Sequence, residues 1–266
     1  PFSNRIEKII RLLIEPYFIS SRLVFRNSNK ITSITDGYIN WIKNFANINK
    51  KNNCFVSPLI RKPLFLTKEQ NDEALASWLK LSLNIKKTRY FCFIGSFTKS
   101  FDFNFIYKYS KLLIVKNPKI KFVICGSGDQ YKNIIQKFDS CQNVLIFGEI
   151  NKFMSKVLIK NSIATLAPYI NNQNFKDHIP NKIIESLENN TPFITTLDGK
   201  LKSMIEEYNN GVFIRNQQNI DITKYQQIIN DKDFQKNLSK NSEKSFKKLF
   251  DFNKTFDKII ENLISM

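Results

Sequence analysis

The chain has 266 residues, of which 42% are hydrophobic and 24% charged, and its formal net charge is +18. This length and composition are typical of a globular protein that buries one large core or two modest ones. The sequence contains no apolar run of about 18 residues, which excludes a membrane-spanning helix, and it shows no signal-peptide pattern.

The positive charge comes mainly from lysine, because only seven of the 41 basic residues are arginine. Proteins that read nucleic-acid sequence rely on arginine, whose planar guanidinium contacts base edges in pairs of hydrogen bonds. Lysine, asparagine, isoleucine and phenylalanine are all abundant, which fits the codon composition of an AT-rich genome. We therefore expect no nucleic-acid partner, and a basic nucleic-acid-binding module remains an alternative.

The cysteines show no C-x-x-C spacing, and two of them, Cys92 and Cys125, lie in apolar runs typical of buried strands. This pattern predicts buried free thiols in a reducing compartment, so we expect a cytoplasmic protein. With one histidine and no cluster of ligands, the sequence predicts no metal site.

The first part of the chain is the most basic, with eleven Lys and Arg residues against three acidic ones in residues 1–62. Apolar residues at helical spacing predict a helix over residues 2–14 that ends near Pro16. This basic amphipathic helix fits an anionic membrane surface equally as well as a neighbouring protein domain. Because the chain begins with Pro1 inside that pattern, we expect further sequence upstream.

Residues 30–36 read as a strand, residues 37–45 as a helix and residues 52–60 as a second strand. Such a strand–helix–strand order is expected of the closing portion of an α/β domain. A domain boundary is predicted within residues 61–87, which include a helix over residues 68–84.

From Tyr90 onward, short apolar strands alternate regularly with helices. The predicted strands cover residues 90–96, 120–128, 143–148, 162–169, 192–196 and 211–214. The predicted helices cover residues 101–115, 130–138, 152–160, 181–188, 202–208, 221–229, 233–249 and 253–264. Strands that are apolar throughout and separated by helices indicate an α/β fold with a doubly wound, Rossmann-like parallel sheet.

Ligands of open parallel sheets bind beyond the carboxyl ends of the strands. That rule selects four loops, residues 95–99, 126–129, 148–150 and 168–181. The last loop runs through Pro180 into a predicted helix, and the N-terminus of a helix attracts anions.

Phe91–Ile214 resembles the nucleotide-sugar-binding C-terminal domain of the group 1 retaining glycosyltransferases, which have the GT-B fold. The matching stretches are F-I-G-S, N-P-K-I-K-F-V-I-C-G-S-G-D, V-L-I-F-G-E-I, L-A-P-Y and I-P-N-K-I-I-E-S-L-E-N-N-T-P-F-I-T-T. They occur in the family's order over about half of the chain, which is far more specific than any one of them.

The resemblance implies four parts of a GT-B protein. Residues 1–62 would be the end of an acceptor-binding N-terminal domain, and residues 63–87 a linker. Residues 88–249 would form the donor-binding domain, and residues 250–266 a terminal helix that crosses back to the N-terminal domain.

It also implies roles for single residues. The family has two acidic residues eight positions apart, which places Asp177 on the transferred sugar and Glu185 on the ribose. Lys182 is then expected to be a phosphate-binding cation. The helix start and the residues before it, His178, Ile179, Pro180 and Asn181, would lie against the donor.

The other donor-binding candidates lie in the three remaining loops. Lys99 matches a phosphate-binding lysine, while Ser96 or Phe97 occupies the position of the family's arginine. The nucleobase is expected beside Glu149 and Ile150, and Gly126 and Gly128 are expected to let the backbone approach the ligand.

We therefore expect a metal-independent, hexosyltransferase-like enzyme that needs no cofactor. It would transfer sugar from a nucleotide-diphosphate sugar to a glycan or lipid-linked acceptor in cell-envelope polysaccharide biosynthesis. The reaction would take place in the cytoplasm, at the inner face of the cell membrane. A non-catalytic GT-B-like scaffold is the main alternative. Asp231-Lys232-Asp233 matches a metal-binding D-x-D pattern, but its place between two helices predicts a helix cap instead.

Overall fold

The computed structural model describes residues 4–49, 54–172, 175–215 and 222–265. It forms two compact units, one of Pro1–Ile60 with Asn253–Met266 and the other of Arg61–Phe252. The parts of the sequence predictions that fall on residues 1–3, 50–53, 173–174, 216–221 and 266 lie outside the described residues.

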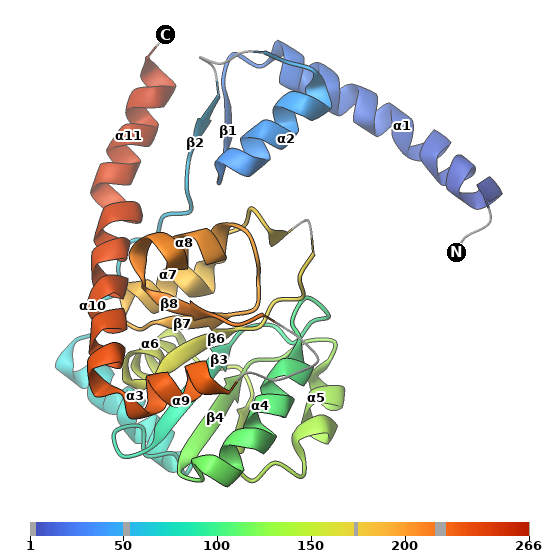
Figure 1. The fold of residues 1–266 in the computed structure, drawn as a ribbon. Helices are drawn as coiled ribbons and strands as arrows, with labels where there is room; N and C mark the ends of the chain where they lie inside the picture. Colours follow the sequence, from blue (N-terminus) through green and yellow to red (C-terminus); the bar gives the residue numbers. More distant parts are fainter. Residues whose placement is uncertain (1–3, 50–53, 173–174, 216–221, 266) are drawn as a thin grey trace. The chain divides into compact units, whose positions relative to one another are not determined.

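The first unit is built on a small parallel β-ladder. Strand β1 (Ile31–Ser33) pairs with β2 (Cys54–Val56), and helix α2 (Asp36–Ala46) connects them. The predicted strand–helix–strand order is therefore present. Helices α1 (Asn4–Asn27) and α11 (Phe252–Ile264) complete the set of elements (Figure 1).

The prediction that the first helix ends near Pro16 is wrong, because α1 continues to Asn27 with Pro16 inside it. A proline inside a helix removes one hydrogen bond and costs about 3 kcal/mol. The C-terminal half is held by packing: the Phe25 ring lies edge-on to Phe45 of α2 at 6.3 Å, and Arg26 Nε donates to the last carbonyl of α2 at 2.7 Å. Neither α1 nor any other described helix is long and apolar enough to cross a membrane.

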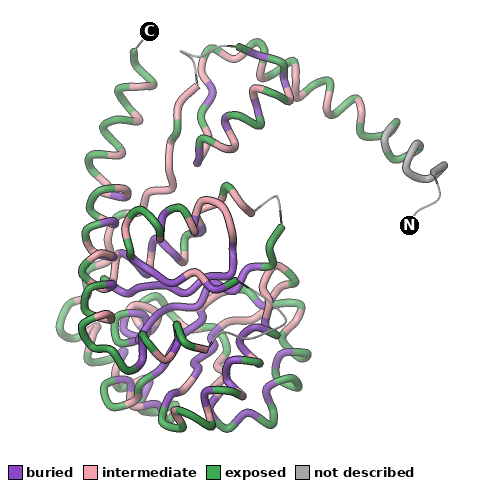
Figure 2. Tube along the Cα trace, in the orientation of Figure 1, coloured by how far each residue is buried: buried purple, intermediate pink, exposed green. Residues whose placement is uncertain are grey.

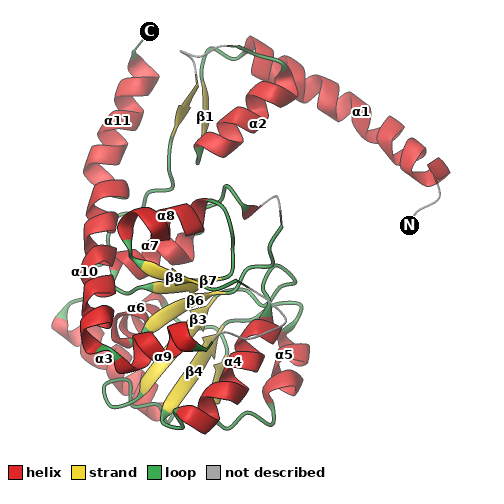
Figure 3. Ribbon diagram, viewed as in Figure 1, coloured by secondary structure: helices red, strands yellow, loops and turns green. Residues whose placement is uncertain are grey.

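The second unit contains a six-stranded sheet with the order β5-β4-β3-β6-β7-β8. All of its strand pairs are parallel (Figure 3), which confirms the predicted doubly wound fold. The strands are β3 (Arg89–Ile94), β4 (Ile120–Cys125), β5 (Val144–Phe147), β6 (Ala164–Ala167), β7 (Phe193–Thr195) and β8 (Gly211–Phe213). The chain builds outward from β3 to β5 and then returns to place β6 on the other side of β3, so the topological switch point lies between β3 and β6.

Helices cover both faces of this sheet. Successive strand residues point to opposite faces, so each strand contributes side chains to both layers. In β3, Tyr90 and Cys92 face α3 (Lys68–Lys80) and α6 (Lys152–Asn161). Phe91 and Phe93 face the helices of the other layer, α4 (Phe103–Lys116), α5 (Tyr131–Phe138) and α9 (Thr223–Asn230). Figure 2 shows most of the strands of this unit as buried, whereas β5 is half-buried. The predicted buried thiols are confirmed, since Cys92 and Cys125 are free and fully buried.

The C-terminal helices follow β8 as predicted. Asp231 caps α10 (Lys232–Leu249) by accepting a hydrogen bond from the Phe234 amide at 2.9 Å. The D-x-D match is therefore a helix cap, as the sequence indicated.

Candidate functional site

The carboxyl ends of all six parallel strands meet at one edge of the sheet, where a doubly wound fold binds its ligands. The loop after β3 and the loop after β6 flank the switch point at this edge. A backbone bridge joins Phe101 to Tyr169 across the switch point, and the Asp102 amide donates to the Pro168 carbonyl at 2.6 Å. The loop after β3 and the loop after β6 are therefore connected by backbone hydrogen bonds and do not move independently of each other.

The glycines of the loop after β4 let two loops pack against each other. Gly126 and Gly128 have φ of +143° and +151°, in the region that favours glycine. A Cβ on Gly126 would lie 2.0 Å from the Gly95 carbonyl oxygen, and a Cβ on Gly128 would lie 2.6 Å from that of Phe97. The sequence predicts that these glycines let the backbone approach a ligand. In the structure the missing side chains leave room for the neighbouring loop, so the backbones of the loops after β3 and β4 are in direct contact.

One of the two residues expected at the position of the family's arginine, Phe97, is buried. Phe97 is fully buried and stacks on Tyr131 at a centroid distance of 5.7 Å. Ser96 and Lys99 are exposed in the same loop. Ser96 is therefore the residue of this pair that is accessible to a ligand, and it carries no charge.

A hollow of about 250 Å³ opens between the first three loops. It is lined by Ile94, Gly95, Ser96, Cys125, Gly126, Ser127, Glu149 and Ile150. Ser127 Oγ donates a hydrogen bond to the carboxylate of Glu149, which is exposed. The predicted residues Ser96, Gly126, Glu149 and Ile150 thus come together, whereas Gly128 is not among those that line the hollow.

The loop before α7 (Asn181–Glu188) brings Asp177 and His178 to the same edge. Asp177 is exposed, and the half-buried His178 donates its amide to the Phe175 carbonyl at 3.0 Å. Desolvation lowers the pKa of His178 below its usual value. Because this pKa is lowered, the neutral imidazole of His178 is the favoured form at pH 7. Ile179, the next residue, is half-buried.

The N-terminus of α7 has no side-chain cap. Its N-cap residue is Pro180, which is buried and has no side-chain hydrogen-bonding group. Asn181, the first helical residue, is exposed, and the Ile183 amide bonds to the Pro180 carbonyl at 2.9 Å. Free amides and the helix dipole make such an end attractive to anions.

Lys182 supplies a second and independent feature that favours an anion. Its Nζ lies above the rings of Phe93 and Phe101, 4.1 and 3.9 Å from their centroids, and 5.6 Å from that of Tyr169. It is buried, and it has no hydrogen-bond partner among the described residues. A Cβ on Gly95 would lie 2.9 Å from this nitrogen, so the amine is directly beneath the β3 loop.

Desolvation by burial lowers the pKa of Lys182 to about 7, while the Glu185 carboxylate raises it. The aromatic faces attract the charged form and partly offset the desolvation. The amine is therefore close to its titration point at neutral pH, and a nearby anion would favour its protonation.

Glu185 takes part in an ion pair that the sequence did not predict. Arg61 Nη1 donates to Glu185 Oε1, and Arg61 Nε lies 3.5 Å from Glu188 Oε2. Lys156 Nζ of α6 lies 3.1 Å from the other oxygen of Glu188. The only sequence signal was the i, i+3 spacing of the two glutamates on one helix face. Their arginine partner is more than 120 residues earlier in the chain.

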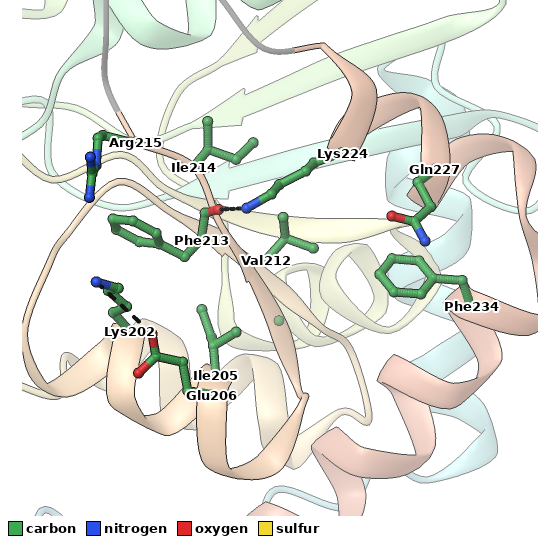
Figure 4. Close-up of a pocket in the computed structure, with 11 residues that line it drawn as sticks. Lys202, Ile205, Glu206, Val212, Phe213, Ile214, Arg215, Lys224, Gln227 and Phe234 are labelled. Carbon is green, nitrogen blue, oxygen red and sulfur yellow. Dashed lines mark hydrogen bonds and ion pairs between the residues drawn. The ribbon is translucent and has the colours of Figure 1, made fainter.

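A larger hollow, of about 550 Å³, lies along the outer edge of β8 and not at the switch point. Figure 4 shows Phe213 and Lys224 in its wall, with Lys224 Nζ donating to the Phe213 carbonyl at 2.7 Å. None of the predicted site residues lines it.

Comparison with known proteins identifies the family and the fold of the chain. The sequence pattern of the family described as "Glycosyl transferases group 1" matches residues 78–245. Among curated proteins, none matches the sequence.

Solved structures with a similar fold include TarM from S. aureus, HepE from Anabaena and WaaG. The TarM mutant complexed with fondaparinux, α-GlcNAc-glycerol and UDP superimposes with a TM-score of 0.67 and 13% identity, over 92% of this chain and 45% of TarM. HepE with UDP and glucose gives 0.73 and 11%, over 93% of this chain and 66% of HepE. WaaG, involved in lipopolysaccharide biosynthesis, gives 0.65 and 14%, over 89% of this chain and 63% of WaaG. The chain thus spans about half to two thirds of the length of these proteins, and at such identities the similarity is one of fold.

Proposed function

Because this chain belongs to the group 1 glycosyltransferase family, we propose that its second unit binds a nucleotide-diphosphate sugar and serves a retaining, metal-independent sugar transfer. The observation that carries the proposal is a helix N-terminus without a side-chain cap beside the buried amine of Lys182, at the switch point of the sheet. Within the part of the chain that the structure describes, this amine has no hydrogen-bond partner. The similar folds solved with UDP support a nucleotide donor.

The chemistry requires a site that stabilises a diphosphate leaving group. Negative charge grows on the diphosphate as its bond to the sugar breaks, and fixed dipoles and cations lower the energy of that state. In our proposal the free amides of α7 and Lys182 bind the diphosphate. Glu185 accepts hydrogen bonds from the ribose hydroxyls, Asp177 and His178 contact the hexose, and the base occupies the hollow beside Glu149 and Ile150.

A thermal-shift series tests donor binding. We expect UDP, GDP or ADP, or one of their sugars, to raise the unfolding midpoint, since a ligand at 100 times its Kd stabilises by about 2.7 kcal/mol. Glu185→Ala should weaken that shift. Glu243→Ala should leave it unchanged, because the side chain of Glu243 is 42% exposed and pairs with Lys247 on α10. The proposal fails if no nucleoside diphosphate shifts the midpoint. Binding without transfer to any acceptor or hydrolysis would instead support a non-catalytic scaffold.

We also propose that the acceptor is a glycan or glycolipid of the cell envelope, used at the inner face of the membrane. Support comes from the WaaG fold and from α1, where large apolar side chains are exposed, among them Leu12 (79%), Leu13 (73%) and Tyr17 (72%). Clustered basic residues attract an anionic leaflet at about 1 kcal/mol each.

Vesicle sedimentation tests this membrane contact. Leu13→Glu should reduce binding to anionic vesicles about tenfold or more, because it removes a leucine whose burial contributes about 1.5–3 kcal/mol. Val115→Glu, at an equally exposed position (81%) on α4, is the control and should not change it. If the wild-type protein did not bind anionic vesicles, or if Leu13→Glu and Val115→Glu bound them equally, the apolar surface of α1 would not be a membrane contact.

A further inference from the structure

Two glutamates of α7 have very different environments although they lie one turn apart. The side chain of Glu188 is 5% exposed and that of Glu185 is 32% exposed. Glu188 Oε1 accepts the Leu64 amide at 3.0 Å and Lys156 Nζ at 3.1 Å. Glu188 is therefore a fixed anchor, to which the segment after residue 60 and helix α6 are both attached.

Arg61 connects this anchor to Glu185. Its Nε faces Glu188 Oε2 and its Nη1 donates to Glu185 Oε1. A guanidinium is planar and its donors have a fixed spacing, so an arginine held at one carboxylate sets the orientation of a second. No described residue bonds to Glu185 Oε2. One oxygen of Glu185 is thus held in place, while the other remains available to a ligand.

The position of this carboxylate also fits the proposed donor. Glu185 borders a small hollow together with Lys152 and Ser155 of the first turn of α6. That turn follows directly on Gly148–Ile150, the loop proposed to meet the base. A ribose attached to a base at that loop has to lie between the base and α7.

We infer that Arg61 is a positioning residue, which orients the Glu185 carboxylate toward the vicinal hydroxyls of a ribose. The inference rests on the proposed function and adds to it a residue outside the family's matched region of 78–245. Arg61 itself need not touch the nucleotide; it acts through Glu185.

The test compares nucleotides that differ only in the ribose hydroxyls. For the nucleoside diphosphate that binds best, affinities of the ribo, 2′-deoxy and 3′-deoxy forms are measured by calorimetry. A hydrogen bond to a charged group predicts that the wild-type protein prefers the ribo form by about 10- to 100-fold. Arg61→Ala should reduce this preference to within about threefold of unity by weakening the ribo form alone. Arg61→Lys should not restore it, because the donors of an ammonium rotate freely and have no fixed spacing with which to orient a second carboxylate.

Arg22→Ala is the matched control, since Arg22 has a similar exposure (37% against 35%) and one ion pair, with Glu15 at 3.3 Å. It should leave the preference intact. If Arg61→Ala lowers the unfolding midpoint so far that binding cannot be measured, Arg61→Gln, which retains one donor group, replaces it.

The possible outcomes distinguish the role of Arg61 from donor binding itself. If Glu185→Ala abolishes the ribo preference but the Arg61 variants keep it, the role of Arg61 is refuted while the donor site stands. Tighter ribo binding in Arg61→Ala also refutes it, because Arg61 would then block Glu185 rather than orient it. A wild-type protein that binds no nucleotide refutes the proposed function and this inference together.

Discussion

Lys182→Met is expected to weaken nucleoside diphosphate binding by about 10- to 100-fold, because it removes a charge-assisted contact of about 1.5–3 kcal/mol. The matching nucleoside, which has no phosphates, should bind both proteins alike. Lys116→Met is the control: this lysine is exposed at the end of α4, at the opposite edge of the sheet. An equal loss for diphosphate and nucleoside would contradict a phosphate role for Lys182.

Proton uptake on diphosphate binding is a second test of the role of Lys182. Since its pKa is about 7 in the free protein, Lys182 is mostly neutral at pH 8 and should take up a proton when a diphosphate binds beside it. The phosphates themselves are already ionised at this pH, with a second pKa of about 6. Calorimetry at pH 8 in buffers of different ionisation enthalpy should detect uptake in the wild-type protein and none in Lys182→Met.

The lowered pKa of Lys182 also makes the free energy of unfolding depend on pH, in a direction that can be predicted. The pKa falls from 10.5 to about 7 on folding, so the unfolded chain holds the extra proton within this window. The contribution of Lys182 to stability therefore rises with pH between these values and is flat below about pH 7. The Lys182→Met protein should lack this slope, so its advantage in unfolding midpoint over the wild-type protein should shrink from pH 7 to pH 10.

Gly126→Ala is expected to destabilise the second unit by about 2–6 kcal/mol, the sum of backbone strain and overpacking. The new Cβ would lie 2.0 Å from the Gly95 carbonyl oxygen at a φ of +143°. Neither loop can retreat easily, because the Gly95 amide bonds to the Cys125 carbonyl at 3.1 Å.

Gly148→Ala is the matched control at the same edge of the sheet, since nothing lies within 4 Å of its added Cβ. Thermal unfolding should show a loss of at least about 5 °C for Gly126→Ala and little change for Gly148→Ala. Equal midpoints for the two variants would mean that the β3 and β4 loops are not packed as the structure shows.

The fold and the family were predictable because their signals are local. Apolar stretches such as residues 90–96 and 120–128, separated by amphipathic helices, indicate a parallel sheet from neighbouring residues alone. The parallel arrangement then brings every loop that follows a strand to one edge, which is how Ser96, Gly126, Glu149 and Ile150 were assigned to one place. The Asp231 cap was also visible in the sequence, because a cap depends on residues three positions apart.

Tertiary structure decided what the sequence alone left open. The continuation of α1 through Pro16 depends on packing against α2, which no local propensity contains. The pKa of Lys182 is lowered because the folded chain buries and desolvates its amine, which lies against the rings of Phe93, Phe101 and Tyr169. Arg61 meets Glu185 across more than 120 residues of chain. The residues themselves determined which loops meet at the candidate site, since the positions of the strands and their parallel direction follow from local patterns. The charge and orientation of the groups within it depend on desolvation and long-range contacts, which exist only once the chain is folded.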